Sequence, residues 1–135
     1  MFDGPLEDRL SIRERIDSYS DAVFRRDAEA WIANWSDEAV WRISGSELRG
    51  RSQIKSAWIA AMDAFAVVGF FATPGAIRVE GGRAIARVYA QEILVDHNGK
   101  VLKIIGVYDD QLVKSAASWL FAERVYTVLH DAVTS

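Results

Sequence analysis

The apolar residues of the chain change their spacing near Ala66, and this change limits the possible folds more than any other feature. Before it, apolar side chains recur every three or four residues, as on one face of a helix. After it, they fall in extended runs separated by Gly81-Gly82 and Asn98-Gly99, two dipeptides typical of hairpin turns. Helices followed by consecutive strands predict an α+β fold in which helices cover one face of an antiparallel sheet.

The first half is expected to contain three helices and one short strand. The helices are expected at residues 6–24, 28–34 and 52–65. Pro5 suits the start of the first helix, and Asp27 is placed to cap the second. Residues 36–38 are predicted to form a turn before a strand at 39–43.

The second half is expected to form a meander. Its strands are predicted at residues 67–73, 76–80, 83–96, 101–113 and 119–129. Pro74-Gly75 is interpreted as a kink or bulge between the first two strands. A length of 135 residues supports a single domain spanning residues 1–135.

The loop lengths predict which residues lie opposite each other. A two-residue loop at Asn98-Gly99 places Tyr89 opposite Tyr108, and a five-residue loop at 114–118 places Tyr108 opposite Arg124. The expected inner face then carries Ile85, Arg87, Tyr89, Gln91, Ile93, Ile104, Tyr108, Asp110, Arg124 and Tyr126. The expected outer face carries Val88, Ala90, Glu92, Lys103, Ile105, Val107, Asp109, Trp119, Phe121 and Glu123.

The two predicted faces differ in character. The inner face mixes aromatic and polar groups, which is typical of a lined cavity beneath helices. The outer face has an apolar centre edged by charges, which favours packing on a partner, most simply a homodimer.

Composition excludes several classes of function. A net charge of −3 gives no support for nucleic-acid binding, and the absence of cysteine excludes disulfides, thiolate metal sites and cysteine nucleophiles. The only histidines, His97 and His130, lie beside a turn and near the end of the chain, and neither is expected to be catalytic or to hold a metal. The acidic start lacks the pattern of a signal peptide, and the apolar stretch at residues 64–72 is too short to span a bilayer. A cytoplasmic protein without metal or organic cofactor is expected.

Five segments together resemble the SnoaL-like domain of the nuclear transport factor 2-like superfamily. They are IRERIDSYSDAVFRRD (12–27), WSDEAVW (35–41), RGR (49–51), GVYDD (106–110) and WLFAERVY (119–126). The resemblance covers nearly the whole chain. It implies a cone-shaped α+β barrel, in which a strongly curved sheet wraps around the helices and leaves a central pocket.

Within the superfamily, the functional parallel is the scytalone dehydratase and hexachlorocyclohexane dehydrochlorinase group. This resemblance implies cofactor-free elimination by an Asp–His pair in which histidine is the base. Asp27 matches the position of the aspartate, and Trp41 and Arg124 match pocket residues. The histidine position falls near Phe70, and a pocket lysine falls at Ala22. The pair of that group is therefore incomplete, although a histidine would suit elimination at neutral pH.

Each candidate site residue also has a structural interpretation. Asp27 is a general base or ligand anchor, or else only a helix cap. Arg124 is an anion anchor in the pocket, or part of a buried ion-pair network with Asp110 and Arg87. The other candidates either contact a ligand or simply fill the core: Tyr19, Tyr89, Gln91, Tyr108 and Tyr126 by hydrogen bonds, and Trp41, Trp58 and Phe70 as apolar wall.

Three functions follow as hypotheses. In the first, the pocket binds a small apolar cyclic or aromatic compound and catalyses elimination, isomerisation or cyclisation, with Asp27 as base or orienting acid and with Arg124 and Tyr108 polarising an oxygen. In the second, the domain binds a ligand or assembles subunits without catalysis. In the third, it resembles the accessory small subunit of ring-hydroxylating dioxygenases.

Overall fold

The computed structural model of the protein describes residues 1–134 and forms three helices and seven strands. The helices are α1 (Leu6–Arg25), α2 (Ala28–Ile32) and α3 (Arg51–Met62). The strands are β1 (Phe2–Asp3), β2 (Trp35–Ile43), β3 (Ser46–Arg49), β4 (Phe65–Glu80), β5 (Arg83–Asp96), β6 (Val101–Ser115) and β7 (Ser118–Thr134).

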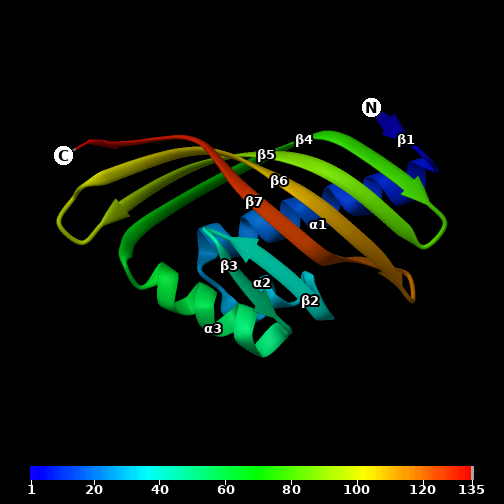
Figure 1. Cartoon of the computed structure of the whole chain (residues 1–135), viewed down its shortest axis with the longest axis horizontal. Helices are drawn as coiled ribbons and strands as arrows, with labels where there is room; N and C mark the ends of the chain where they lie inside the picture. The colour runs from blue at the N-terminus through cyan, green and yellow to red at the C-terminus, as the bar shows by residue number, and fades with distance from the viewer. Residues whose placement is uncertain (135) are drawn as a thin grey trace.

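The strands form one sheet in the order β1-β4-β5-β6-β7-β2-β3. Strands β4 to β7 are the predicted antiparallel meander, whereas β1 pairs with β4, and β2 with β7, in parallel. The sheet is not closed into a barrel, but it curves over the helices, which all lie on one side of it (Figure 1). The expected α+β fold with three helices packed on a strongly curved sheet is confirmed.

Helix α1 has an apolar face that packs against the sheet. Ile12, Ile16, Tyr19 and Val23 are spaced along this face and are all buried. The helix ends at Arg26, which has a left-handed backbone with φ of 55°. The Arg26 guanidinium donates to the carbonyl oxygens of Met62 and Phe65, which ties the end of α1 to the turn between α3 and β4.

The space between helices and sheet is an aromatic core. Trp31, Trp35, Trp119 and Phe121 are fully buried there. The rings of Trp31 and Trp58 stack with centroids 4.6 Å apart and an interplanar angle of 8°. These contacts place the aromatic residues of the first half and of β7 in one continuous core.

Several local predictions in the first half need correction. Strand β2 begins at Trp35, so residues 36–38 lie within an irregular part of this strand, where the pairing with β7 shifts between Trp35 and Val40. Helix α2 is shorter than predicted and ends at Ile32. Strands β1 and β3 were not predicted.

The predicted register between β5 and β6 is wrong by one residue. Val88, not Tyr89, lies opposite Tyr108. The loop contains the three residues 97–99 between Asp96 and Lys100, and Gly99 takes the positive φ of 84° that such a loop requires. Because side chains alternate between the faces of a strand, this slip exchanges the two faces of β5.

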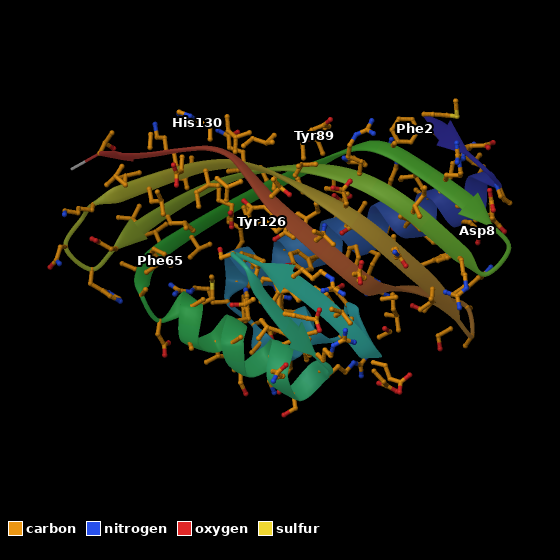
Figure 2. The ribbon with its side chains drawn as sticks, in the orientation of Figure 1. Phe2, Asp8, Phe65, Tyr89, Tyr126 and His130 are labelled. Carbon is orange, nitrogen blue, oxygen red and sulfur yellow. The ribbon has the colours of Figure 1, made fainter. Side chains whose placement is uncertain are left out.

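The exchange moves two candidate site residues. Tyr89 and Gln91, expected on the inner face, are exposed on the outer face, and Figure 2 shows Tyr89 on the side of the sheet away from the helices. Ile85 and Arg87 also lie outside. In the opposite direction, Val88, Ala90 and Glu92, expected outside, lie inside or partly inside: Val88 and Ala90 are buried and Glu92 is partly buried.

Near Tyr108, the register between β6 and β7 differs from the predicted one by two residues. A shift of two residues leaves every side chain on its predicted face of the sheet. Tyr108 lies opposite Tyr126, and Asp110 lies opposite Arg124. A register shift next to Gln111 then turns Trp119 and Phe121, which were expected outside, into the core.

Candidate functional site

The inner face of the sheet holds a buried ion pair between Arg124 on β7 and Asp110 on β6. Arg124 Nε and Nη2 donate to the two carboxylate oxygens of Asp110 at 2.7 and 3.0 Å. The guanidinium carbon also lies 3.8 Å from the ring centroid of Tyr108, 4.1 Å from that of Phe121 and 4.5 Å from that of Tyr19. Three aromatic faces therefore stabilise the cation in addition to its carboxylate.

Burial and charge act in opposite directions on this pair. Burial disfavours the charge on Arg124, but the Asp110 carboxylate and the oxygens of Tyr19 and Tyr108 together outweigh it and raise the pKa of Arg124. Burial raises the pKa of Tyr19 and of Tyr108, and the positive charge of Arg124 opposes that rise. Burial also raises the pKa of Asp110, and the charge and hydrogen bonds of Arg124 oppose that rise. The two phenols beside the pair stay neutral at neutral pH.

Beside this pair, three tryptophans carry buried hydrogen-bond donors without acceptors. The Nε1 atoms of Trp31, Trp35 and Trp41 are buried and form no hydrogen bond of ordinary geometry among the described residues, although Trp31 lies close enough to the Tyr19 oxygen to oppose the rise in the pKa of that phenol. Their rings form one cluster, with pairwise centroid distances of 5.4 to 5.9 Å. A buried donor without an acceptor costs about 1–3 kcal/mol, so three in one cluster mark a place where the protein lacks acceptor atoms.

A second carboxylate of the inner face, Glu92 on β5, accepts a hydrogen bond from Tyr126. The phenol oxygen of Tyr126 lies 2.7 Å from Glu92 Oε2. Burial raises the pKa of Glu92, and the hydrogen bond from Tyr126 opposes that rise. Burial and the charge of Glu92 together raise the pKa of Tyr126, which keeps this phenol protonated as the donor.

Glu92 was missed as a site residue because the predicted register placed it outside. It is the cross-strand partner of Phe70, so it lies beside the position where the resemblance expects a histidine. The pattern of β5 held a signal for its face, because residues 84, 86, 88 and 90 are all alanine or valine and alternate with larger or polar residues. That alternation is typical of a strand whose even-numbered residues pack beneath a helix layer.

The structure places Asp27 at the N-terminus of α2. One carboxylate oxygen accepts from the backbone N–H of Ala30 at 3.0 Å, and the other lies 3.2 Å from Arg25. The Ala30 hydrogen bond, followed by the charge of Arg25, lowers the pKa of Asp27. The carboxylate therefore acts as a helix cap, and its lowered pKa makes it a weak base. The side chain is also 40% exposed.

The remaining candidates fall into two groups. Tyr19, Trp41, Trp58, Phe70, Tyr108 and Arg124 are buried in the interior, and Tyr126 is partly buried beside them. The Tyr19 ring links several of them, with its centroid 5.6 Å from that of Phe70 and 6.4 Å from that of Tyr108. Tyr89 and Gln91 are not part of this interior.

The histidines and the acidic residues form no metal site within residues 1–134, where no group of three or more potential ligands lies close enough to hold an ion. His97 is exposed, with Nε2 2.8 Å from the carbonyl oxygen of Asp63, and His130 is exposed on β7. In the same range of residues, no helix is long and apolar enough to cross a membrane.

The fold is shared with several solved structures. A candidate aromatic ring hydroxylase from Novosphingobium aromaticivorans superimposes with a TM-score of 0.89 at 21% identity, covering 97% of this chain and 96% of that chain. A candidate scytalone dehydratase from the same organism gives a TM-score of 0.88 at 17% identity, covering 96% and 89%. Hexachlorocyclohexane dehydrochlorinase from Novosphingobium barchaimii gives 0.80 at 14% identity, covering 96% and 92%.

These identities are low, so the structural likenesses establish the fold alone. No curated protein matches the chain. The sequence itself matches the SnoaL-like domain family over residues 4–125, which is most of its length. This protein therefore belongs to the SnoaL-like domain family, within the nuclear transport factor 2-like fold.

Proposed function

We propose that the interior binds a small, largely apolar cyclic or aromatic compound that carries a hydrogen-bond acceptor. The observation that carries this proposal is the cluster of buried indoles, in which Trp35 and Trp41 have no acceptor among the described residues and Trp31 has only the Tyr19 oxygen nearby, without a hydrogen bond of ordinary geometry. A carbonyl oxygen, an ether oxygen or a halogen of a ligand would supply the missing acceptor, and the surrounding rings would contact its apolar skeleton.

The carboxylates of the interior leave this need for an acceptor unmet. Asp110 is occupied by Arg124, and Glu92 accepts from Tyr126. The names of similar proteins point to the same class of compound, since hexachlorocyclohexane is a halogenated apolar ring. Aromatic side chains pack closely here, so entry of a ligand requires ring rotations or a shift of α2 relative to the sheet.

The test compares two ligands with the same carbon skeleton. The ketone 2-tetralone carries an acceptor, and tetralin does not. We expect 2-tetralone to raise the Tm more than tetralin, and Trp41→Phe to reduce that difference by removing one indole N–H while keeping an aromatic ring. Equal shifts for both compounds, or no shift for either, would contradict the proposal.

Catalysis by elimination, isomerisation or cyclisation is a second proposal, supported by the dehydratase and dehydrochlorinase neighbours. In this proposal Asp27 acts as base or orienting acid, and Arg124 with Tyr108 polarises an oxygen. The cap contacts and lowered pKa of Asp27 count against its action as a base. If Asp27 is catalytic, Asp27→Asn abolishes turnover of a bound compound, whereas undiminished turnover removes Asp27 from the mechanism.

We also propose a homodimer through the outer face of the sheet. Ile85, Tyr89 and Ile105 are exposed there by 53, 43 and 49%, beside a hollow of about 440 Å³. Arg87 and Asp109 are cross-strand partners at this hollow, so a two-fold axis could place Arg87 against Asp109 of the partner subunit.

Light scattering after gel filtration tests this assembly. We expect a dimer mass for the wild type and a monomer mass for Ile105→Lys, with Leu10→Lys on α1 as the control for an added charge at an exposed apolar residue. A monomeric wild type contradicts the proposal. A larger complex with a copurifying second protein would instead support the accessory-subunit hypothesis, which the name of one neighbour, an aromatic ring hydroxylase, suggests.

A further inference from the structure

We propose that Glu92 is the proton-transferring base of this interior and that Tyr126 is its positioning residue. This inference rests on the proposed function, since it concerns the same site and the same class of ligand. The reaction is removal of a proton from a carbon next to the carbonyl group of a bound ketone.

Asp110, Asp27 and Glu92 differ in what neutralises their carboxylates. Asp110 forms a two-point ion pair with Arg124, and Asp27 binds a backbone N–H and Arg25. Glu92 accepts a single hydrogen bond, from a neutral phenol, and forms no ion pair with the described residues. Of the three, Glu92 therefore keeps the most basicity for a substrate.

The surroundings of Glu92 suit an apolar substrate. Its cross-strand partners are Phe70 on β4 and Ile104 on β6, and Phe70 is buried. Directly opposed residues on one sheet face have Cβ atoms about 4.5–5.5 Å apart, so both side chains flank the carboxylate. An apolar ring packed on Phe70 and Ile104 would bring its carbon–hydrogen bonds next to the carboxylate.

Tyr126 is held firmly enough to aim the carboxylate. Its ring packs against that of Tyr108, with centroids 4.5 Å apart. The ring also lies directly over Gly106, where any Cβ would overlap it. The lack of a side chain at Gly106 thus creates the space in which the phenol reaches Glu92. Gly106, Tyr126 and Glu92 come from three adjacent strands, so the rigid sheet fixes their geometry.

The electrostatics support the assignment. Burial raises the pKa of Glu92, and a base whose pKa lies closer to neutrality is more effective than an ordinary carboxylate. The titratable groups that respond to the charge of Glu92 are Tyr126, Tyr108 and Tyr19, and this charge contributes to the raised pKa of each. The buried cation Arg124 is occupied by Asp110.

The proton-transfer step is balanced without a co-reactant. The carbon–hydrogen bond breaks, the proton moves to the Glu92 carboxylate, and the electron pair moves into an enolate whose charge rests on the former carbonyl oxygen. Return of a proton to the same carbon gives exchange with solvent, and return to a different carbon of a conjugated substrate gives isomerisation.

The probe is 2-tetralone in D₂O, with loss of its C1 and C3 proton signals followed by NMR. We expect the wild type to accelerate exchange over buffer, and Glu92→Gln to reduce that acceleration by about 100-fold or more. The rise in Tm caused by 2-tetralone should persist in this variant. Glu92→Asp, which keeps a shortened carboxylate, should retain part of the exchange, and Glu7→Gln, the same change at an exposed residue of α1, serves as control.

Tyr126→Phe tests positioning separately. Because the Tyr126 hydrogen bond lowers the pKa of Glu92, its loss should shift the midpoint of the pH–exchange profile upward, an effect that general loosening of the fold would not produce. Exchange that persists in Glu92→Gln, or a wild type that binds 2-tetralone without accelerating exchange, overturns this inference alone. A wild type whose Tm does not respond to 2-tetralone overturns the proposed function and this inference with it.

Discussion

The guanidinium of Arg124 donates hydrogen bonds to both carboxylate oxygens of Asp110. Both residues are almost completely buried, with exposed fractions of 1% for Arg124 and 3% for Asp110. This pairing joins β6 to β7 at the centre of the inner face. It occupies the donor groups of Arg124 that point toward Asp110, which favours a structural role for the pair and leaves Glu92 as the interior carboxylate without a cation.

Removal of one member of the ion pair should destabilise the protein strongly. Asp110→Asn leaves the Arg124 charge buried without a counter-charge, which typically costs about 3–5 kcal/mol. Urea unfolding should show this loss, whereas Asp17→Asn, the same change at an exposed residue of α1, should change stability little. The double variant Asp110→Leu/Arg124→Met should recover much of the loss, and failure to recover it would show that the charges themselves are required.

The cap at Asp27 should tolerate asparagine and not alanine. Asn accepts the Ala30 hydrogen bond as well as Asp does, so Asp27→Asn should keep most of the Tm, and Asp27→Ala should lower it. Because the pKa of Asp27 is lowered in the folded protein, its contribution to stability is present above pH 3.8 and is lost as the pH falls through its folded pKa. Equal Tm values for the two variants would contradict the cap.

A side chain at Gly106 should displace Tyr126. Gly106→Ala places a Cβ in steric overlap with the hydroxyl end of the Tyr126 ring, and overpacking of this kind costs about 1–3 kcal/mol. Gly69→Ala on β4 is a matched control, since its Cβ would meet neighbours only at 3.6 Å or more. Thermal unfolding should separate the two variants, and a similar Tm for both would place the Tyr126 ring elsewhere.

The raised pKa of Glu92 makes the free energy of unfolding depend on pH. Its folded pKa lies above the ordinary 4.5, so its contribution to stability is fully present below pH 4.5 and is lost as the pH rises through the folded pKa. The free energy of unfolding of the wild type should therefore fall relative to that of Glu92→Gln between pH 4.5 and neutrality. Urea titrations across this range provide the measurement, and a pH-independent difference would indicate an exposed carboxylate.

The candidate site was predictable where the error in strand register was an even number of residues, because such an error leaves each side chain on its predicted face. Tyr108, Asp110, Arg124 and Tyr126 were expected on the inner face and lie there, because the error between β6 and β7 was an even number of residues near the site. Tyr89 and Glu92 were assigned to the wrong faces, because the Asn98-Gly99 loop contains three residues and not two.

The sequence by itself determined the three helices, the antiparallel meander of β4 to β7 and the α+β class, because apolar periodicity and turn dipeptides are local signals. The family followed from the resemblance of five short segments, and the match over residues 4–125 confirms it. Tertiary structure alone decided the strand register, the packing of Trp31, Trp35 and Trp41 into a cluster short of acceptors, and the meeting of Glu92 with Tyr126. The physical reason is that strand side chains alternate with a period of two. One residue of loop geometry, settled by how the whole sheet packs on its helices, therefore decides which side chains share the interior.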